Sequence, residues 1–454
     1  MRMPQTPHVL VIVQNLPVPL DRRVWLEAQA LTAAGYVVTV ICPKGPGDPA
    51  RETIDGIAIY KYRPAPQAEG LLGFVIEFVY SWIRTAWLSI VVRRERGFDV
   101  IQACNPPDTY WLLAALWRLR GVLFIFDQHD LNPELFRSRF GEPSSRGQVA
   151  QYRGLVWLER MTYRFAHRVI STNESYRRIA IQRGRRSPSD VTVVRSGPDT
   201  TRMRPVHPRG EPDRGRHLLV YLGIMGPQDG VDAVLEVMAE LVHHRGHTDV
   251  RAALLGFGDC LEDLKEQAHR LGLDEYVEFT GRVGPDVIAD YLSAASVGLC
   301  PDRKTPLNDV STMNKTMEYM AYAVPPVSFD LTETRVSAAE TGLYVPSGDV
   351  PGFTDAIERL LKDADLRTEL SLAARVRLVE SLDWRPQADR YVGVFDELTR
   401  RPARETPEGW PARERRAPLE PGPGRDPQGR QYVDLRLPGE LERFVRARGP
   451  HPTA

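Results

Sequence analysis

Short apolar runs alternate with amphipathic stretches along most of the chain. Residues 9–13 and 37–41 are almost wholly apolar, and the stretch between them carries apolar residues at helical spacing. Asp21 can cap that helix at its start, and Gly35 can end it. A strand, a helix and a second strand within this length form a βαβ unit, whose strands run parallel. The pattern therefore predicts an α/β domain with a parallel sheet.

The same alternation begins again in the second half of the chain. Residues 200–216 are rich in proline, arginine and glycine, which is typical of a linker. We therefore expect an α/β fold of two Rossmann-like parallel-sheet domains, over 1–205 and 206–383. Apolar runs predict strands of the second domain near these positions: 217–223, 251–256, 277–281 and 296–301.

The last part of the chain has a different composition. Residues 401–454 are dense in proline, arginine and glutamate and poor in apolar side chains, so we expect a disordered tail. A second interpretation stays open, in which residues 432–448 form a short amphipathic helix on a partner. The solvated tail is the favoured prediction.

Residues 71–92 form the longest apolar stretch, with a length sufficient to span a bilayer. Glu77 and Arg84 lie within it, and together they would cost several kcal/mol at a bilayer centre. We therefore expect a long helix with one apolar side, packed on the sheet or lying on a membrane surface. Packing on the sheet is favoured. Three arginines beside this helix could meet anionic lipid: Arg93, Arg94 and Arg96.

Charge and cysteine content narrow the classes of function. The formal net charge is zero, which argues against a general nucleic-acid binder. The four cysteines are scattered without a C-x-x-C pair, so we expect reduced thiols and neither a disulfide framework nor a zinc site. The run over 9–13 is too short for the core of a secretory signal. These features predict a cytoplasmic protein, with the inner membrane face as a further place for it.

Polar side chains gather where two predicted strands of the first half end. In open α/β sheets, ligands bind outside the carboxyl ends of the strands. The first of these strands runs into a loop near residue 105, and the second ends near residue 128. The candidate site residues at these ends are Asn105, Asp108, His129, Asp130 and Glu134.

The stretch over 305–329 reads as a loop, a helix, a sharp stop and a strand. Three residues are candidate N-caps of the helix: Asp309, Ser311 and Thr312. A capped helix start attracts anions, Lys315 adds a positive charge, and Glu318 could accept from two vicinal hydroxyls. This arrangement would fit a nucleotide. The alternative is a core helix packed through its methionines, which recur at 313, 317 and 320.

The same stretch carries a family resemblance. The run Asn314-Lys-x-x-Glu-Tyr-Met-Ala321, followed by Pro-x-Val, resembles the nucleotide-sugar signature of family 4 retaining glycosyltransferases, which have the GT-B fold of two domains facing a cleft. The resemblance implies that Glu318 holds the donor ribose. The family's second glutamate, eight residues earlier, is Val310 here. Its helix-ending glycine is Ala323, and a positive φ at that alanine would cost about 1 kcal/mol.

The resemblance extends over most of the chain and adds further residues. It implies that the histidine matching His129 touches the donor sugar, and that residues 384–400 form a helix crossing back to the first domain. The arginine and lysine that bind diphosphate in most of the family are replaced near Ile224, Met225 and Asp229. Other donor-binding groups are therefore expected to substitute: Lys315, Arg282, Asn314 and the backbone near Gly223, Gly226, Gly256 and Gly258.

The resemblance implies an enzyme that moves a sugar, with retention, from a nucleoside-diphosphate sugar to a saccharide or a lipid-linked acceptor. We expect a UDP-linked donor, a role in cell-surface polysaccharide or glycoconjugate synthesis, and neither a metal nor a cofactor, since no Asp-x-Asp stands in a suitable place. The expected catalytic residues are His129, Asp130 and Glu134, with Asn105 and Asp108 on the acceptor side. Two alternatives stay open: a non-hydrolysing sugar-nucleotide epimerase, and a catalytically silent scaffold.

Overall fold

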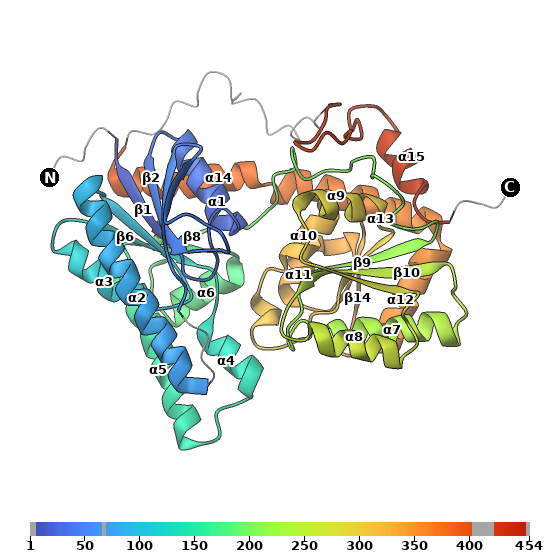
Figure 1. Ribbon diagram of the computed structural model, residues 1–454, viewed down its shortest axis with the longest axis horizontal. Coiled ribbons are helices and arrows are strands. Elements are labelled where there is room, and N and C mark those ends of the chain that lie inside the picture. The colour runs from blue at the N-terminus through green and yellow to red at the C-terminus, as the bar shows by residue number, and fades with distance from the viewer. Residues whose placement is uncertain (1–5, 66–69, 402–421, 451–454) are drawn as a thin grey trace. The chain divides into compact units, whose positions relative to one another are not determined.

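The computed structural model describes residues 6–65, 70–401 and 422–450 (Figure 1). The chain divides into two compact units, each with its own sheet. Unit 1 contains the chain up to Ser196 and the stretch from Arg385 to the end of the last long helix. Unit 2 contains Gly197–Trp384 and the described tail. The boundary thus lies somewhat earlier than the expected one at residue 205.

Unit 1 is built on an eight-stranded sheet in the order β3-β4-β2-β1-β5-β6-β7-β8. Neighbouring strands are parallel except β3 and β4, which form an antiparallel edge pair. This confirms the parallel sheet expected from the βαβ pattern. The strands are β1 (His8–Ile12), β2 (Val37–Pro43), β3 (Arg51–Ile54), β4 (Ile57–Tyr62), β5 (Val100–Cys104), β6 (Leu123–Gln128), β7 (Arg168–Ser171) and β8 (Val191–Val193).

The first helix of unit 1 begins and ends at the residues that the sequence predicts. The Asp21 side chain accepts from the Val24 amide at 3.1 Å, and Gly35 has a φ of 77° after the helix. The returning helix docks through Tyr391, whose hydroxyl bonds Gln102 inside the unit. The helices are α1 (Arg22–Ala33), α2 (Gly70–Glu95), α3 (Tyr110–Arg118), α4 (Asn132–Phe140), α5 (Arg146–Phe165), α6 (Glu174–Gln182) and α14 (Trp384–Thr399).

Unit 2 has a six-stranded sheet in the order β11-β10-β9-β12-β13-β14, and each neighbouring pair is parallel. The strand order reverses beside β9, and such a switch point is where ligands bind in open α/β sheets. The strands are β9 (His217–Ile224), β10 (Val250–Phe257), β11 (Val277–Gly281), β12 (Val297–Cys300), β13 (Pro326–Phe329) and β14 (Leu343–Val345).

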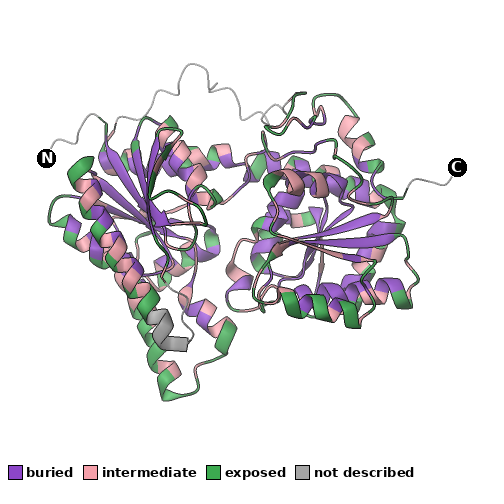
Figure 2. Ribbon diagram, viewed as in Figure 1, coloured by how far each residue is buried: buried purple, intermediate pink, exposed green. Residues whose placement is uncertain are grey.

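Helices cover both faces of the unit 2 sheet, whose strands are buried (Figure 2). One apolar cluster joins the sheet to α7, α8 and α12, and a second joins it to α9, α10 and α13. The helices are α7 (Val231–Ala239), α8 (Leu261–Arg270), α9 (Pro285–Ala294), α10 (Asn314–Ala321), α11 (Thr332–Ala338), α12 (Val350–Lys362), α13 (Ala364–Arg377) and α15 (Glu440–Arg446).

The tail corrects one prediction. Residues 402–421 and 451–454 lie outside the described residues, but 422–450 fold against unit 2. The Val433 amide donates to the Pro205 carbonyl at 3.0 Å, and the Arg204 guanidinium lies 3.7 Å from the centre of the Tyr432 ring. The expected disorder is therefore wrong for this segment. Composition missed it because the segment is anchored by a few buried side chains rather than by a long apolar run. Helix α15 packs on α13 of its own unit.

The stretch over 71–92 forms a helix, as predicted, and its inner side packs on unit 1. Thr85, Leu88, Ser89 and Val92 are buried. Within residues 6–65, 70–401 and 422–450, every helix falls short of what crossing a bilayer requires. The four cysteines are free, as expected.

Candidate functional site

The carboxyl ends of β9, β10 and β12 meet at one edge of the unit 2 sheet, and α10 follows in the chain after β12. Met313 precedes α10 in extended conformation and provides no side-chain cap. The predicted N-caps are therefore wrong. Asp309 instead accepts from the Thr332 amide at 2.8 Å, and the Ser311 hydroxyl donates to the Leu307 carbonyl. A short helical turn over Asn308–Val310 ends before α10 and keeps Asp309, Ser311 and Thr312 out of capping position.

Lys315 is buried in the first turn of α10. Its ammonium donates to the Asp302 carboxylate at 2.6 Å and lies 4.8 Å from the centre of the Tyr221 ring. Burial lowers the pKa of Lys315, but Asp302, Tyr221 and Asp229 together outweigh burial and raise it. The ammonium is therefore held in place and already paired. Asp302 lies two residues after the end of β12, and this place after a strand is the sequence signal that could have indicated it.

Glu318 lies one turn after Lys315 and is 7% exposed. Met317, Tyr319 and Met320 are fully buried, so the core-helix interpretation of this stretch is correct. Lys315 and Glu318 are also buried on this short helix. Charged side chains are rarely buried unless partnered, and the lysine has its partner in Asp302. A buried glutamate at the ligand-binding edge of the sheet is suited to accept hydrogen bonds from hydroxyl groups.

The glycines of the strand ends bring the protein's own backbone together. A Cβ on Gly256 would lie 1.8 Å from the Gly223 carbonyl oxygen, and one on Gly258 would lie 2.5 Å from the Met225 carbonyl oxygen. The Gly226 amide already donates to Asp229 at 2.9 Å. The glycines thus permit the β9 and β10 ends to pack closely. This packing accounts for Gly256 and Gly258 without any approach of phosphate.

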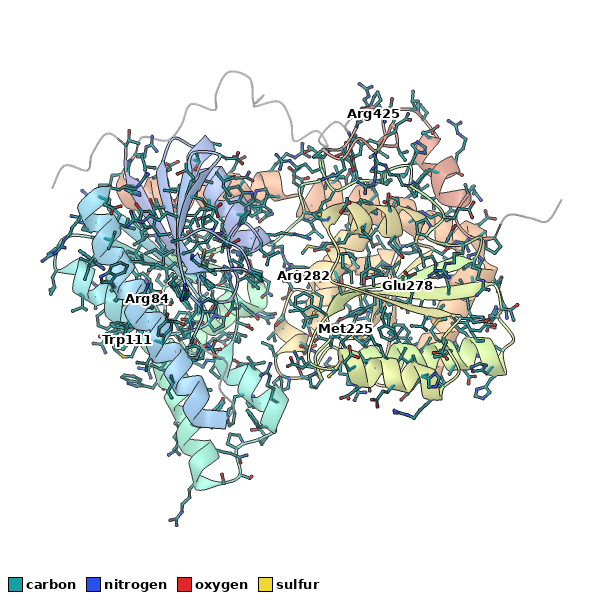
Figure 3. The ribbon with its side chains drawn as sticks, viewed as in Figure 1. Arg84, Trp111, Met225, Glu278, Arg282 and Arg425 are labelled. Atoms are coloured by element: carbon teal, nitrogen blue, oxygen red, sulfur yellow. The ribbon has the colours of Figure 1, made fainter. Side chains whose placement is uncertain are left out.

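Arg282 is the exposed cation beyond the end of β11 (Figure 3). Its guanidinium lies 5.0 Å from the centre of the Phe257 ring. Within the described part of the chain, no carboxylate forms an ion pair with it. By contrast, the positive charge of Lys315 is balanced by Asp302, and the negative charge of Asp229 also acts on it. Arg282 is therefore the better placed of the two expected substitutes to meet a mobile anion.

Unit 1 brings four of the five expected polar residues together at the ends of β5 and β6. The Asn105 amide oxygen accepts from the His129 and Asp130 amides at 2.7 and 3.1 Å. The Asn105 nitrogen donates to the Asp108 carboxylate at 3.0 Å. Burial raises the pKa of Asp108 to about 6 and also raises the pKa of Asp130. The cluster is therefore held by one asparagine and carries carboxyl groups suited to bonding hydroxyls.

A buried network of polar side chains holds the ring of His129. Its Nε2 lies 2.8 Å from Asp127 Oδ2 and 3.1 Å from Arg23 Nε. Gln102 donates to both Asp127 and Glu27 at 2.9 Å. Burial raises the pKa of Glu27 far above its usual range, whereas Arg23 and His129 outweigh burial and lower that of Asp127. The two shifts are opposite in direction, so Asp127 is the more acidic of the two carboxyl groups.

The sequence pattern did not indicate Arg23, Glu27 and Asp127 as parts of the site. Arg23 and Glu27 belong to the Asp-Arg-Arg-Val-x-x-Glu run at the start of α1. Ligand atoms of Glu27, Cys104, Asp127 and His129 lie within 4.8 Å of one another. The Arg23 guanidinium contacts both carboxylates at 2.9 and 3.0 Å and supplies positive charge there, so a metal ion would have to compete with it.

Glu134 does not join the cluster around Asn105. Both of its oxygens accept from Arg183, at 2.5 and 2.9 Å, and Arg183 also bonds Glu159. The expected catalytic grouping of Glu134 with His129 and Asp130 is therefore not supported. Glu134 lies in the first turn of α4, and from there its side chain reaches Arg183, the residue after α6. A bidentate pair of arginine and carboxylate is strong.

Two family descriptions match the chain. Residues 20–197 match "Glycosyl transferase 4-like domain", and residues 216–363 match "Glycosyl transferases group 1". Among curated proteins, the chain is 27% identical over 185 residues to an alpha-D-kanosaminyltransferase of Streptomyces kanamyceticus, covering 40% of this chain and 46% of that protein. It is 29% identical over 211 residues to a GDP-mannose-dependent alpha-(1-6)-phosphatidylinositol monomannoside mannosyltransferase of Mycolicibacterium smegmatis, covering 45% and 53%. The chain thus spans about half the length of these two relatives.

Solved structures with the same fold are more distant in sequence. A sucrose-phosphate synthase of Thermosynechococcus elongatus superposes with a TM-score of 0.69 at 17% identity, covering 86% of this chain and 99% of that one. HepE of Anabaena in complex with UDP-glucose superposes with a TM-score of 0.63 at 15% identity, covering 86% and 99%. These likenesses show the fold.

Proposed function

Because the chain belongs to the family 4 glycosyltransferases of the GT-B fold, we propose that it moves a sugar from a nucleoside-diphosphate sugar to an acceptor hydroxyl. The observation that carries the proposal is the position of α10. This helix places Glu318 and Lys315 at the carboxyl edge of the unit 2 sheet, beside the switch point at β9. The family signature and the ligand-binding edge of the fold therefore coincide.

In this proposal the Glu318 carboxylate accepts hydrogen bonds from the vicinal hydroxyls of the donor ribose. The uncapped amides at the start of α10 and the exposed Arg282 meet the diphosphate. Lys315, paired with Asp302, fixes the end of β12 beside this region. The negative charge that develops on the leaving diphosphate is thereby stabilised without a metal ion, which is the main electrostatic task in glycosyl transfer from such donors.

We propose that the Asn105 cluster of unit 1 serves the acceptor and the transferred sugar. Asp108 and Asp130 can accept hydrogen bonds from hydroxyls, and Asp127 holds the ring of His129. Neither the cluster nor the unit 2 edge presents a free pair of carboxylates like that of retaining glycosidases. Retention, which the family resemblance implies, would then rest on positioning and on leaving-group stabilisation.

The proposal leaves open which nucleoside the donor carries. We expect UDP, as in the HepE complex, whereas the Mycolicibacterium relative is named for GDP-mannose. The test is calorimetric titration of the protein with UDP, GDP and ADP, followed by incubation with the matching sugar nucleotides. We expect micromolar binding of one nucleotide and its slow release from the sugar nucleotide. Absence of binding to all three, or isomerised sugar without release, would contradict the proposal.

We further propose that the acceptor is lipid-linked and that unit 1 meets an anionic membrane. The outer side of α2 exposes large apolar side chains at helical spacing: Ile76, Val79, Ile83, Trp87 and Ile90. Its other side packs on α3, where Trp117 donates to Ser89 at 3.1 Å. Helix α3 in turn exposes Leu112, Leu116 and Leu119. Adjacent exposed apolar side chains on a monomer mark an interaction surface.

Positive charge accompanies this apolar surface. Helix α5 packs on α3 through Trp111, whose ring lies 5.0 Å from that of Phe165 (Figure 3 labels Trp111). Helix α5 exposes four side chains on one of its faces: Arg153, Trp157, Arg160 and Arg164. Of the arginines first expected to meet lipid, Arg94 and Arg96 are exposed, whereas Arg93 donates to the Phe98 carbonyl. Arginine beside tryptophan is typical of the interface with anionic lipid.

Sedimentation with vesicles tests the membrane proposal. The protein should sediment with phosphatidylglycerol vesicles at low salt and be released at high salt, because each basic side chain contributes about 1 kcal/mol that salt screens. Replacing Arg153, Arg160 and Arg164 with glutamine should weaken binding strongly. The matched control replaces three exposed arginines elsewhere: Arg202, Arg270 and Arg425. Wild-type protein that stays in solution at low salt would overturn the proposal.

A further inference from the structure

The C-terminal end of α10 is closed by an unusual turn. The Val324 amide donates to the Tyr319 carbonyl at 2.9 Å, and the Ala323 amide donates to the Met320 carbonyl at 3.0 Å. This is the Schellman arrangement, in which the residue at Ala323 takes a left-handed conformation; its φ is 53°. The turn leaves the carbonyls of Ala321, Tyr322 and Ala323 in need of donors inside the protein.

Two buried arginines supply those donors. Arg448, from the tail, donates through Nη1 to the Ala323 carbonyl at 2.6 Å and through Nη2 to the Tyr322 carbonyl at 2.7 Å. Arg375, from α13, donates to the Ala321 carbonyl at 2.8 Å. Each of the three carbonyls is thereby satisfied.

Arg448 also places a positive charge at the negative end of the helix dipole. Its side chain is buried, and Nε donates to the Ser293 carbonyl at 2.9 Å. Among the described residues, only backbone carbonyls accept from its guanidinium. A cation at a helix C-terminus stabilises the helix, and more so when it is partly buried. The interaction of Arg448 is therefore directed at the end of α10 and not at a carboxylate.

The rest of the tail is anchored so that Arg448 reaches this place. Arg430 bonds the Asp290 carboxylate of α9 at 2.7 Å, and Val445 of α15 is buried. Tyr432 belongs to the same apolar cluster as Met317 and Met320 of α10. Figure 1 shows the tail lying along unit 2, in red. The tail thus joins the apolar cluster to which α10 belongs and bonds the carbonyls at the end of that helix.

We infer that residues 422–450 form a positioning element for the donor site, with Arg448 as its positioning residue. Arg448 holds the last turn of α10, and Glu318 lies one turn before Tyr322 on that same two-turn helix. A helix this short has little intrinsic stability, so its geometry depends on its ends. The inference rests on the proposed role of α10 in nucleotide binding. It gives a function to a segment whose composition suggested a solvated tail.

The test compares variants of the full chain. Arg448→Ala should weaken binding of the nucleotide by about tenfold at a temperature where the protein is fully folded, since two charge-assisted bonds to α10 are lost. Arg448→Lys should recover part of the affinity. The matched control is Arg446→Ala, which removes an exposed arginine two residues away whose partners include Asp365. It should leave the affinity within about twofold.

Two further measurements separate positioning from general stability. Leu360→Ala empties a buried position in α12, away from α10, and should lower the melting temperature while leaving nucleotide affinity unchanged. Amide hydrogen exchange of residues 319–324 should accelerate in Arg448→Ala alone, with or without nucleotide.

Equal affinity of Arg448→Ala and wild type would overturn the inference. So would equal weakening by Leu360→Ala, because the effect would then be general destabilisation. Wild-type protein that binds no nucleotide would instead overturn the proposed function. The exchange measurement needs no ligand and would distinguish that result from a failure of the inference.

Discussion

One buried side chain, Arg23, joins the parts of the unit 1 site. Its guanidinium bonds Asp127 at 3.0 Å and the Val194 carbonyl at 3.0 Å, and it lies against Glu27 and His129. The same group thus compensates a buried carboxylate, orients the histidine and fixes the chain after β8. Breaking a buried charged network of this kind leaves an uncompensated charge, which is far more costly than losing a surface pair.

Arg23→Met should therefore lower the free energy of unfolding by about 3–5 kcal/mol, because Asp127 would remain buried without its main counter-charge. The neighbouring residue Arg22 is exposed, so Arg22→Met is the matched control and should change stability by less than about 1 kcal/mol. Urea unfolding of both variants provides the measurement. Equal losses in the two variants would show that the network does not carry the predicted energy.

His217 provides a pH-dependent prediction. Burial lowers its pKa from 6.5 to about 4, with Arg367 adding to the effect. Between these pH values the unfolded chain binds a proton that the folded protein does not, so stability falls as the pH falls from 6.5 toward 4. The loss should reach roughly 2–3 kcal/mol. His217→Gln should lose less stability than wild type between pH 7 and 4.5; parallel curves would contradict the assignment.

Single residues were the hardest level to predict from sequence. Ala323 stands where the family has a glycine, and its φ is positive, at 53°. Asp127 was missed because it sits near the end of an apolar strand and its role depends on Arg23, which is far away in the chain. Asp302 was missed because nothing in the local pattern shows that Lys315 pairs with it. The N-caps of α10 were misplaced because a short turn over Asn308–Val310 uses the polar residues locally.

At the scale of elements, α10 combines two interpretations that the sequence left open. It is a core helix, with Met317 and Met320 buried, and it carries Lys315 and Glu318 to the edge of the sheet. Strands and long helices were predicted well, because continuous apolar runs and apolar residues at period 3.6 report burial directly. The tail was predicted badly, because its order depends on arginines bonding carbonyls and carboxylates of unit 2.

The end of α10 allows a paired test of backbone strain. Ala323→Gly should raise the free energy of unfolding by about 0.5–1 kcal/mol, because glycine takes the left-handed conformation without a clash. Ala321→Gly, inside the same helix, should lower it by about 1 kcal/mol. Thermal unfolding of the two variants is sufficient. A loss of stability in Ala323→Gly would show that the alanine is not strained.

At the scale of the whole molecule, each unit has its own sheet, core and candidate cluster. The division into two Rossmann-like units followed from the repeated pattern of apolar runs and from the linker composition. The family was inferred chiefly from the signature on α10. The family descriptions match residues 20–197 and 216–363, and thus both units. Which sugar and which acceptor the protein uses depends on the side chains around the bound ligands. Neither the hydrophobic pattern nor the composition of the sequence reports the arrangement of those side chains.

The central claim is that unit 2 binds a nucleoside-diphosphate sugar through α10. The most direct measurement is calorimetric titration of wild type, Glu318→Ala and the control Glu236→Ala with the nucleotide that wild type binds. Glu236 is an exposed carboxylate on α7. Glu318→Ala should lose roughly 1.5–3 kcal/mol of binding free energy while remaining folded, because its hydrogen bonds to the ribose are charge-assisted. Glu236→Ala should bind like wild type. An unchanged affinity in Glu318→Ala would contradict the account.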